Sequence, residues 1–305
     1  MEQGRLQERD TGLSPALGLS PKEIGNRIRL CRKQGIPFVI ALVGAGGKTT
    51  VMYHLSKELI QQGYRTAVTT TTHIYLPEQG ICIPVLKNER NTEDRKEERS
   101  WQKGKYGMDN RQQEPQSYGK ELEKFRKKLE EGWKRQQRTG ESLTVGALSL
   151  EPGDKLSALP EAFLQELESE TDILLVESDG SRHLPLKVPA QWEPVILPET
   201  SLVIGCVGLS ALGKPWKEVC FRKESASFFF GKVPDREVTE ERVAAILIDE
   251  RGIRKGSGHR EYRVILNQGD SAADRERANR ILEMINGKCE GGICCSFCVK
   301  ETSST

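Results

Sequence analysis

The sequence of 305 residues has little excess charge of either sign and few aromatic residues. Forty-six lysines and arginines face 44 aspartates and glutamates, which leaves a formal net charge of +2. Proteins that coat DNA or RNA carry a dominant positive field, so this balance argues against a nucleic-acid partner. Aromatic residues make up 6% of the chain and the mean hydropathy is −0.55, which predicts a polar segment beside a folded core.

Long apolar runs are also absent from the sequence. No stretch approaches the roughly 18 to 20 apolar residues that span a bilayer, and the polar start MEQGRLQERD lacks the pattern of a signal peptide. We therefore expect a cytoplasmic protein without a membrane partner. The eight cysteines do not suggest a small secreted scaffold, because four of them fall in the last 17 residues, and we expect reduced thiols.

The polar segment runs from residue 87 to residue 141 and is rich in charged residues and glutamine. We interpret it as a partly disordered insertion. Four apolar residues within it are three or four positions apart, which places them on one face of a helix. They are Leu122, Phe125, Leu129 and Trp133. Such a helix either docks on a partner or a membrane surface, or rests as a partly folded, solvated helix on its own domain, and we favour the second interpretation.

Outside the insertion, short apolar runs alternate with helical patterns. Runs that are apolar on both faces and separated by helices predict an α/β fold, with a mostly parallel sheet covered by helices on both faces. Strands are expected at 37–44, 65–72, 172–179, 202–208 and 262–270, and helices at 49–62, 161–168, 239–249 and 271–285. The predicted organisation is a flexible N-terminus (1–20), a single domain formed by 21–86 and 142–288, and a C-terminal segment (289–305) that is a cysteine-containing tail or a final strand.

The string GAGGKTT lies between a predicted strand and a predicted helix, where a P-loop binds phosphate. Glycines allow the backbone to approach the oxyanions, Lys48 supplies a positive charge, and the Thr49 hydroxyl completes a Mg²⁺ shell. The common pattern GxxxxGK[ST] requires a glycine where this chain has Leu42, so the loop is a shortened variant that resembles the GxxGKTT loop of the Mur ligases. The candidate phosphate-binding residues are Gly44, Gly46, Gly47, Lys48, Thr49 and Thr50.

The run DILLVESDG supplies the acidic element that a nucleotide site needs. Glu177 and Asp179 are two positions apart and therefore point to the same side of an extended strand. We predict that Lys48, Glu177 and Asp179 are catalytic, and that Thr49 and Asp179 hold Mg²⁺. Either carboxylate is also able to polarise the attacking water, and the spacing does not separate the two roles.

Two further motifs follow predicted strands. VILNQGD resembles the NKxD element by which GTPases read guanine, with Asn267 supporting the loop and Asp270 accepting from the base. Gln268 replaces the usual lysine, so the choice between ATP and GTP stays open. The loop SDGSRHLPLKVP is polar and constrained by proline, and Arg182 and Lys187 in it, with Lys214 after another strand, are candidate contacts for an anionic second substrate.

Several segments occur together and in order: VGAGGKTT, TTTTHIYLPE, DKLSALPEAF, LLVESDGSRHLPLKVPAQWEPVILPE, VIGCVGLSALGKPW and VILNQGD. This combination resembles the YqeC family, accessory proteins of selenium-dependent molybdenum hydroxylases. The stretch ESDGSR followed by PLK and EP is its most specific part. The resemblance implies a P-loop NTPase-like fold and, as partner, a selenium-dependent molybdenum hydroxylase or its maturation factors.

Together these features predict a Mg²⁺-dependent nucleotide-binding protein, an NTPase that uses ATP or GTP to assist maturation of such a hydroxylase. Two alternatives remain open. One is a nucleotide-sensing delivery chaperone with little hydrolysis. The other is an ATP-dependent ligase or kinase that activates a small substrate, which the Mur-like loop suggests.

Overall fold

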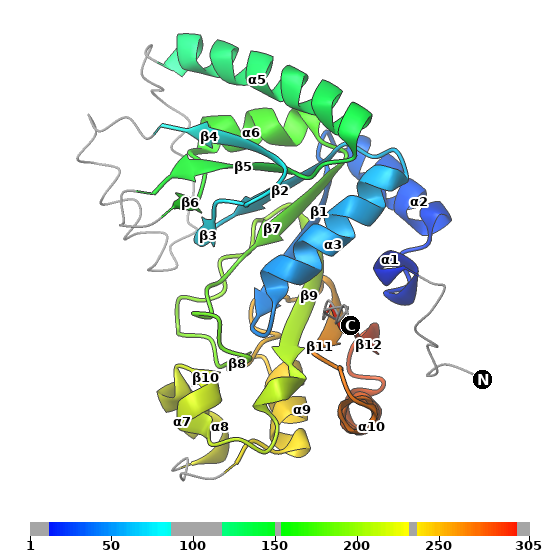
Figure 1. The fold of residues 1–305 in the computed structure, drawn as a ribbon, viewed down its shortest axis with the longest axis vertical. Helices are drawn as coiled ribbons and strands as arrows, with labels where there is room; N and C mark the ends of the chain where they lie inside the picture. Colours follow the sequence, from blue (N-terminus) through cyan, green and yellow to red (C-terminus); the bar gives the residue numbers. More distant parts are fainter. Residues whose placement is uncertain (1–11, 87–117, 150–153, 232–236, 298–305) are drawn as a thin grey trace, which may run out of the picture.

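A ten-stranded sheet forms the centre of the computed structural model, which describes residues 12–86, 118–149, 154–231 and 237–297 (Figure 1). The strand order is β12-β11-β9-β1-β7-β2-β5-β6-β3, and β4 pairs with β5. The strands are β1 (Phe38–Gly44), β2 (Thr66–Thr70), β3 (His73–Tyr75), β4 (Ile81–Val85), β5 (Leu143–Leu148), β6 (Lys155–Ser157), β7 (Ile173–Glu177), β9 (Thr200–Gly208), β11 (Glu261–Asn267) and β12 (Gly291–Cys294).

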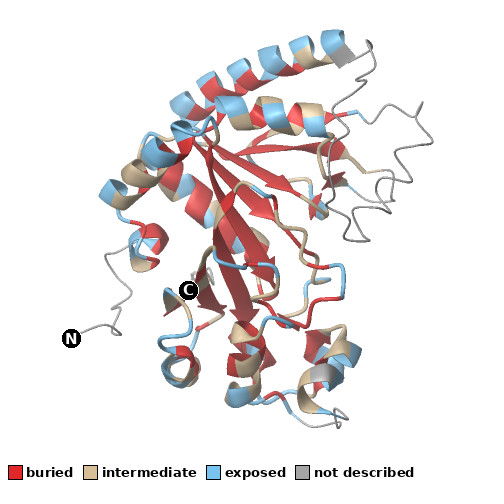
Figure 2. Ribbon diagram, turned by 180° about the vertical axis from the view of Figure 1, so that it is seen from behind, coloured by how far each residue is buried: buried red, intermediate tan, exposed pale blue. Residues whose placement is uncertain are grey.

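The sheet is mostly parallel, as the apolar runs predict. β1 lies between β7 and β9 and is parallel to both, while the short strand β6 is antiparallel to its neighbours β5 and β3. All residues of β1 and β7 are buried, because helices cover the sheet from both sides (Figure 2). The α/β fold class is confirmed.

Successive side chains of β1 pack into hydrophobic clusters on opposite faces of the sheet. Ile40 and Leu42 pack with α1, α2 and α3, whereas Ala41 and Val43 face α9 and α10, since successive side chains of a strand point to opposite faces. Two more helices, α5 and α6, cover the part of the second face near β4 and β5. The helices are α1 (Leu13–Ala16), α2 (Pro21–Arg32), α3 (Lys48–Gln61), α5 (Tyr118–Thr139), α6 (Glu161–Glu170), α9 (Glu240–Ile248) and α10 (Ala272–Ile285).

Residues 12–20 are folded, which corrects the expected flexible N-terminus of residues 1–20. Leu17 and Leu19 are buried against α2 and α3, and the backbone N–H groups of Leu13 and Ser14 donate to the Glu58 carboxylate at 2.6 and 2.7 Å. The sequence did not predict this folding, because the three buried leucines of the segment, Leu13, Leu17 and Leu19, do not repeat with a helical period. Residues 1–11 lie outside the described part of the chain.

Helix α5 belongs to the core, which corrects the extent of the predicted insertion. Phe125, Leu129 and Trp133 are buried in one cluster with β4, β5 and α6. The Gln136 side chain accepts from the backbone N–H of Thr66 at 3.2 Å and donates to its carbonyl at 2.9 Å, which ties the helix to the start of β2. The apolar face therefore rests on its own domain. Residues 87–117 lie outside the described residues.

A small parallel sheet stands beside the carboxyl end of the main sheet. It joins β8 (Leu186–Lys187) to β10 (Cys220–Phe221), next to the short helices α7 (Trp216–Val219) and α8 (Ser227–Phe230). The cysteines in the described part of the chain are free thiols. Among the described residues, no helix is both long and apolar enough to cross a membrane.

Candidate functional site

The glycine-rich segment predicted to bind phosphate, residues 44–47, joins β1 to α3 at the carboxyl edge of the sheet, and we call it the phosphate loop. Close contacts within the protein require its glycines. Gly44 and Gly46 have φ angles of 96° and 75°, in the left-handed region. A Cβ atom at Gly46 would lie 2.0 Å from the backbone N of Gly208, and one at Gly44 would lie 2.3 Å from the Cys206 carbonyl oxygen. The sequence suggested that these glycines leave room for phosphate oxyanions. The structure shows that they also allow the backbone of β9 to approach the loop closely.

The first turn of α3 presents backbone donors. Gly47 is the N-cap residue, with φ 97° and no capping side chain, and the first helical hydrogen bond runs from Val51 N to Gly47 O at 3.0 Å. Within the described residues, nothing accepts a hydrogen bond from the N–H groups of residues 47–50. Free N–H groups and the positive end of the helix dipole favour an anion at this point.

Lys48 is buried beside two carboxylates. Its Nζ lies 3.2 Å from Asp179 Oδ1 and 3.7 Å from Glu177 Oε1, and it donates to the Gly44 carbonyl at 2.7 Å. Burial works to lower the pKa of Lys48, but the charges of Asp179 and Glu177 outweigh it and raise the pKa above its ordinary value. The ammonium group therefore stays charged, and the site has a permanent cation at the phosphate loop.

Glu177 and Asp179 do not play equivalent parts, although their spacing suggested a shared direction. Glu177 Oε2 accepts a hydrogen bond from the Thr49 hydroxyl at 2.7 Å, and burial raises the pKa of Glu177 against the opposing effects of Lys48 and Thr49. Asp179 accepts from the Gly44 N–H at 3.0 and 3.1 Å and pairs with a cation through each oxygen, Lys48 at 3.2 Å and Lys187 at 3.0 Å. Asp179 thus fixes the phosphate loop, while Glu177 lies beside the Thr49 hydroxyl.

Lys187 and Glu193 extend this cluster toward the surface. Lys187 is completely buried, pairs with Glu193 at 3.0 Å and donates to the Gly180 carbonyl at 2.7 Å. Glu193 in turn pairs with Arg222 at 3.2 Å. Lys187 was predicted to contact substrate; its ammonium group is buried and held by protein partners, and the contact with substrate stays a prediction. The two prolines around Lys187 indicated a rigid loop, but no local pattern indicated Arg222.

The ion pairs described above form a charge chain that runs from Lys48, which also pairs with Glu177, through Asp179, Lys187 and Glu193 to Arg222. Aromatic and cationic side chains lie where this charge chain reaches the surface. The Arg222 guanidinium is 5.2 Å from the centre of the Trp192 ring, which is 52% exposed, and the exposed Arg182 is 5.3 Å from the Phe221 ring. Arg182 and Arg222 have φ angles of 50° and 61°, which are uncommon for residues other than glycine. Lys214 is exposed after β9, and none of the ion pairs among the described residues includes it.

Asn267 and Asp270 occupy different positions at the end of β11. The buried Asn267 donates to the Gly46 carbonyl at 2.9 Å and accepts from the Gln268 N–H at 2.8 Å, so it supports the phosphate loop. Asp270 is exposed and accepts a hydrogen bond from the Ser296 hydroxyl. Thr50 is exposed in the first turn of α3. The structure thus brings the predicted phosphate, metal and Asn267 residues to one edge of the sheet.

The residues present fit Mg²⁺ held together with a phosphate. In the described ranges, no group of three or more His, Cys, Asp or Glu side chains could hold a metal ion alone. Mg²⁺ usually keeps several waters and takes one or two carboxylates together with substrate phosphates. One hydroxyl and one carboxylate, from Thr49 and Glu177, therefore form a suitable partial shell.

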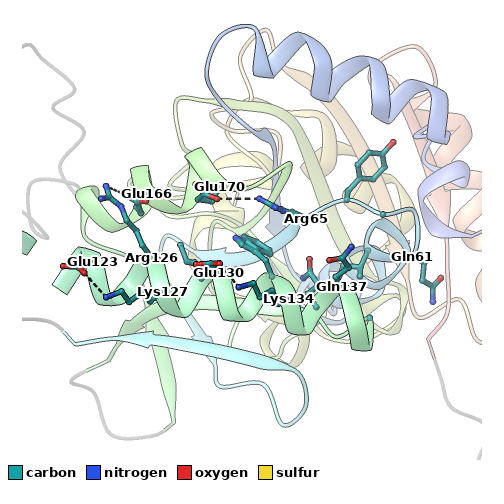
Figure 3. A pocket seen from close by; sticks show the side chains of 17 residues that line it. Gln61, Arg65, Glu123, Arg126, Lys127, Glu130, Lys134, Gln137, Glu166 and Glu170 are labelled. Atoms are coloured by element: carbon teal, nitrogen blue, oxygen red, sulfur yellow. Dashed lines mark hydrogen bonds and ion pairs between the residues drawn. The ribbon is translucent and has the colours of Figure 1, made fainter. Parts of the chain in front are cut away.

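A cavity of about 1100 Å³ lies elsewhere, between α5, α6 and the amino end of β2 (Figure 3). Its lining side chains pair with one another, as Arg126 does with Glu166 at 2.6 Å and Lys127 with Glu123 at 2.8 Å. Ligands of parallel α/β sheets bind at the carboxyl ends of the strands, so we do not assign this cavity to the functional site.

Comparison with known proteins agrees with the resemblance seen in the sequence. The chain is 27% identical over 220 residues to "Uncharacterized protein YqeC" of Escherichia coli (strain K12), covering 72% of this chain and 71% of that protein. No solved structure matches the chain. The sequence model of the family described as "YqeC protein" matches residues 40–224, which include the phosphate loop, both carboxylates and Arg222. Since the match covers more than half of the 305 residues, the chain belongs to the YqeC family.

Proposed function

We propose that the protein is a P-loop nucleoside triphosphatase that binds ATP or GTP with Mg²⁺. The observation that carries this proposal is the arrangement of Lys48 at the uncapped N-terminus of α3, with Thr49 and Glu177 beside it. The free N–H groups and the lysine bind the phosphates, and the hydroxyl and carboxylate complete the metal shell.

Within this proposal, we assign the magnesium carboxylate to Glu177 rather than Asp179. Glu177 contacts the Thr49 hydroxyl, as expected of an acidic residue beside the P-loop threonine. Both oxygens of Asp179 already face lysines and the Gly44 N–H. Gly180 follows these carboxylates, and a Cβ atom there would meet nothing within 4 Å, so a phosphate has room to approach its backbone.

Lys48 changes partners in the proposed cycle. In the structure it is paired with Asp179 and Glu177, which keeps it buried at the mouth of the loop. Phosphate oxygens would accept charge-assisted hydrogen bonds from Lys48 in place of the two carboxylates, and Glu177 and Thr49 would hold Mg²⁺, which would supply positive charge beside Glu177.

Phosphoryl transfer to an anionic acceptor is a second candidate function. It is favoured by two arginines at the end of the charge chain that starts at Lys48: Arg182 lies over the partly buried Phe221 ring, and Arg222 lies over the exposed Trp192 ring. Guanidinium groups bind carboxylates and phosphates in pairs of hydrogen bonds. On this alternative, the acceptor occupies that surface and water does not attack.

Membership of the YqeC family supports an accessory role. We extend the proposal to the maturation of a selenium-dependent molybdenum hydroxylase, the partner that the sequence resemblance implies. Phosphate release measured with and without that hydroxylase tests this step. An increase on adding the hydroxylase supports it, and an unchanged rate contradicts it.

The nucleotide proposal is tested by replacing Lys48. Lys48→Ala should weaken binding of Mg·ATP or Mg·GTP by about 100-fold, because several charge-assisted contacts to phosphate are lost. The matched control is Lys57→Ala, which removes an exposed lysine from the same helix. Isothermal titration calorimetry measures both. Equal affinities of Lys48→Ala, Lys57→Ala and the unaltered protein would exclude the proposed P-loop.

A further inference from the structure

The segment after β12 crosses the edge of the sheet beside the phosphate loop. Cys295 N donates to the Leu266 carbonyl and Gly269 N donates to the Cys295 carbonyl, both at 2.9 Å. A Cβ atom at residue 269 would lie 2.4 Å from the Cys294 sulfur, so the close approach requires Gly269. Backbone hydrogen bonds on both sides therefore fix the segment against the end of β11.

Three consecutive side chains of this segment reach the surroundings of the phosphate loop. Cys295 Sγ lies 3.6 Å from Asn267 Oδ1, the side chain that supports Gly46, and Ser296 donates to the Asp270 carboxylate. The Phe297 ring stacks on His54 of α3, with 4.1 Å between ring centres and 22° between planes. The segment thus connects the end of β11 to the helix that begins at Lys48.

On the β7 side of the phosphate loop, hydrogen bonds join the ends of β2 and β7 to the segment around Val195. The N–H of Thr71 donates to the Glu177 carbonyl at 3.1 Å, and its hydroxyl donates to the Val195 carbonyl at 2.7 Å. Val195 N donates to the Ser178 carbonyl at 3.0 Å. The β11 side is where Asp270 is exposed and Phe297 is half-buried, and it is the side on which a nucleoside would find an aromatic ring and a carboxylate.

We propose that residues Cys295–Phe297 form the wall against which the nucleoside of the bound nucleotide packs. The stacked rings of Phe297 and His54 supply an aromatic surface for the base, and Ser296 is a positioning residue that orients the Asp270 carboxylate. This inference rests on the proposed nucleotide binding. It adds a segment that lies outside the matched residues 40–224.

Inorganic tripolyphosphate separates the wall from the phosphate loop, because it has the phosphates of a nucleotide and no nucleoside. The full-length chain and its Phe297→Leu, His54→Ala and Ser296→Ala variants are titrated with tripolyphosphate, ATP and GTP in the presence of Mg²⁺. Leucine retains most of the packing volume at position 297, and His54 is exposed, so His54→Ala tests the wall with little risk to folding. Phe163→Leu in α6 is the matched control for a phenylalanine far from the site.

Phe297→Leu and His54→Ala should each weaken the better of the two nucleotides by about fivefold or more while tripolyphosphate affinity stays within about twofold, since base stacking is lost. Ser296→Ala should change the ratio of GTP to ATP affinity and leave tripolyphosphate binding alone. If the affinities for nucleotide and tripolyphosphate fall equally, or if neither falls, the proposed wall is wrong. The proposed phosphate binding by the loop is not affected by that result. Failure of the unaltered protein to bind any of the three would remove the proposed nucleotide function and the wall together.

Discussion

The carboxyl edge of the sheet around the phosphate loop, which we call the phosphate edge, and helix α5 are both rich in charged residues. The charged side chains are buried at the phosphate edge and exposed on α5. At the phosphate edge, the side chains of Lys48, Asp179 and Lys187 are at most 2% exposed and each pairs with a neighbour. On α5, Glu123 and Lys127 form an i,i+4 pair with 64% and 70% exposure. Buried charges require partners, whereas exposed pairs add little to stability, so the buried set is the one with a function to explain.

The two regions also differ in what holds them in place. Helix α5 is held by the apolar contacts of Phe125, Leu129 and Trp133, while the phosphate edge is held by ion pairs and backbone hydrogen bonds. Substitutions should therefore separate stability from ligand binding, and the following predictions are ordered from the largest expected effect to the smallest.

Lys187→Met should destabilise the protein by about 3 to 5 kcal/mol, because it leaves Asp179 and Glu193 as buried carboxylates without their shared cation. Urea unfolding at neutral pH measures the change. Lys223→Met removes an exposed lysine nearby and serves as the control. If Lys187→Met is as stable as the unaltered protein, the buried ion pairs contribute no more to the free energy of unfolding than the exposed pairs of α5.

Trp133→Ala should cost about 3 kcal/mol, because it leaves a cavity under α5. Its affinity for Mg·ATP or Mg·GTP, measured by calorimetry on the folded protein, should not change. Lys127→Ala on the same helix should leave the unfolding midpoint where it is, since the pair with Glu123 is exposed. Loss of nucleotide binding in folded Trp133→Ala would mean that the two regions are coupled.

Glu177→Gln should reduce Mg²⁺-dependent tightening of nucleotide binding by about tenfold or more and leave metal-free nucleotide binding nearly unchanged. Because burial raises the pKa of Glu177, the carboxylate protonates at a higher pH than an ordinary glutamate, and Mg²⁺ affinity should fall as pH is lowered through that raised pKa. Glu177→Gln should lack this pH dependence. If Asp179→Asn shows these effects in its place, the magnesium carboxylate is Asp179.

Glu168 on α6 is partly buried, and its burial is thus intermediate between the buried charges of the phosphate edge and the exposed charges of α5. Burial and the nearby charge of Glu199 raise the pKa of Glu168 to about 7 from 4.5. The folded state therefore keeps a proton that the unfolded state releases, and stability falls as pH rises from about 4.5 to about 7. Glu168→Gln should be more stable than the unaltered protein by about 1 kcal/mol at pH 8, after screening, and equally stable near pH 4. Parallel pH profiles from thermal unfolding would contradict this.

The sequence predicted β1, β7 and β9 because each contains a continuous apolar run that ends at glycine or an acidic residue. The predicted run at 172–179, for example, contains β7 (Ile173–Glu177). The short strands β3 and β6 were missed because three residues are too few to show an alternation. Helix α5 was recognised by its spacing, but its burial depends on tertiary contacts, among them those with β4, from which residues 87–117 separate it in sequence.

The candidate site was predictable where chemistry lies in one string and not where it depends on distant contacts. Lys48 and Thr49 are adjacent to the glycines that place them. The difference between the two carboxylates was not visible, because β7 ends at Glu177 and Asp179 lies beyond the strand, where alternation no longer applies. The pairing of Glu193 with Arg222 joins two loops and has no local signal.

The charge chain from Lys48 to Arg222 has a thermodynamic consequence for ligand binding. It contains three carboxylates, Glu177, Asp179 and Glu193, and three cations, Lys48, Lys187 and Arg222, so the ionised cluster is electroneutral. When Lys48 turns to a phosphate, Glu177 loses its cation, whereas Asp179 keeps its pair with Lys187. A divalent ion held by Glu177 would restore the missing positive charge. Nucleotide and metal should therefore bind with positive heterotropic linkage, and each should tighten the other by the same factor.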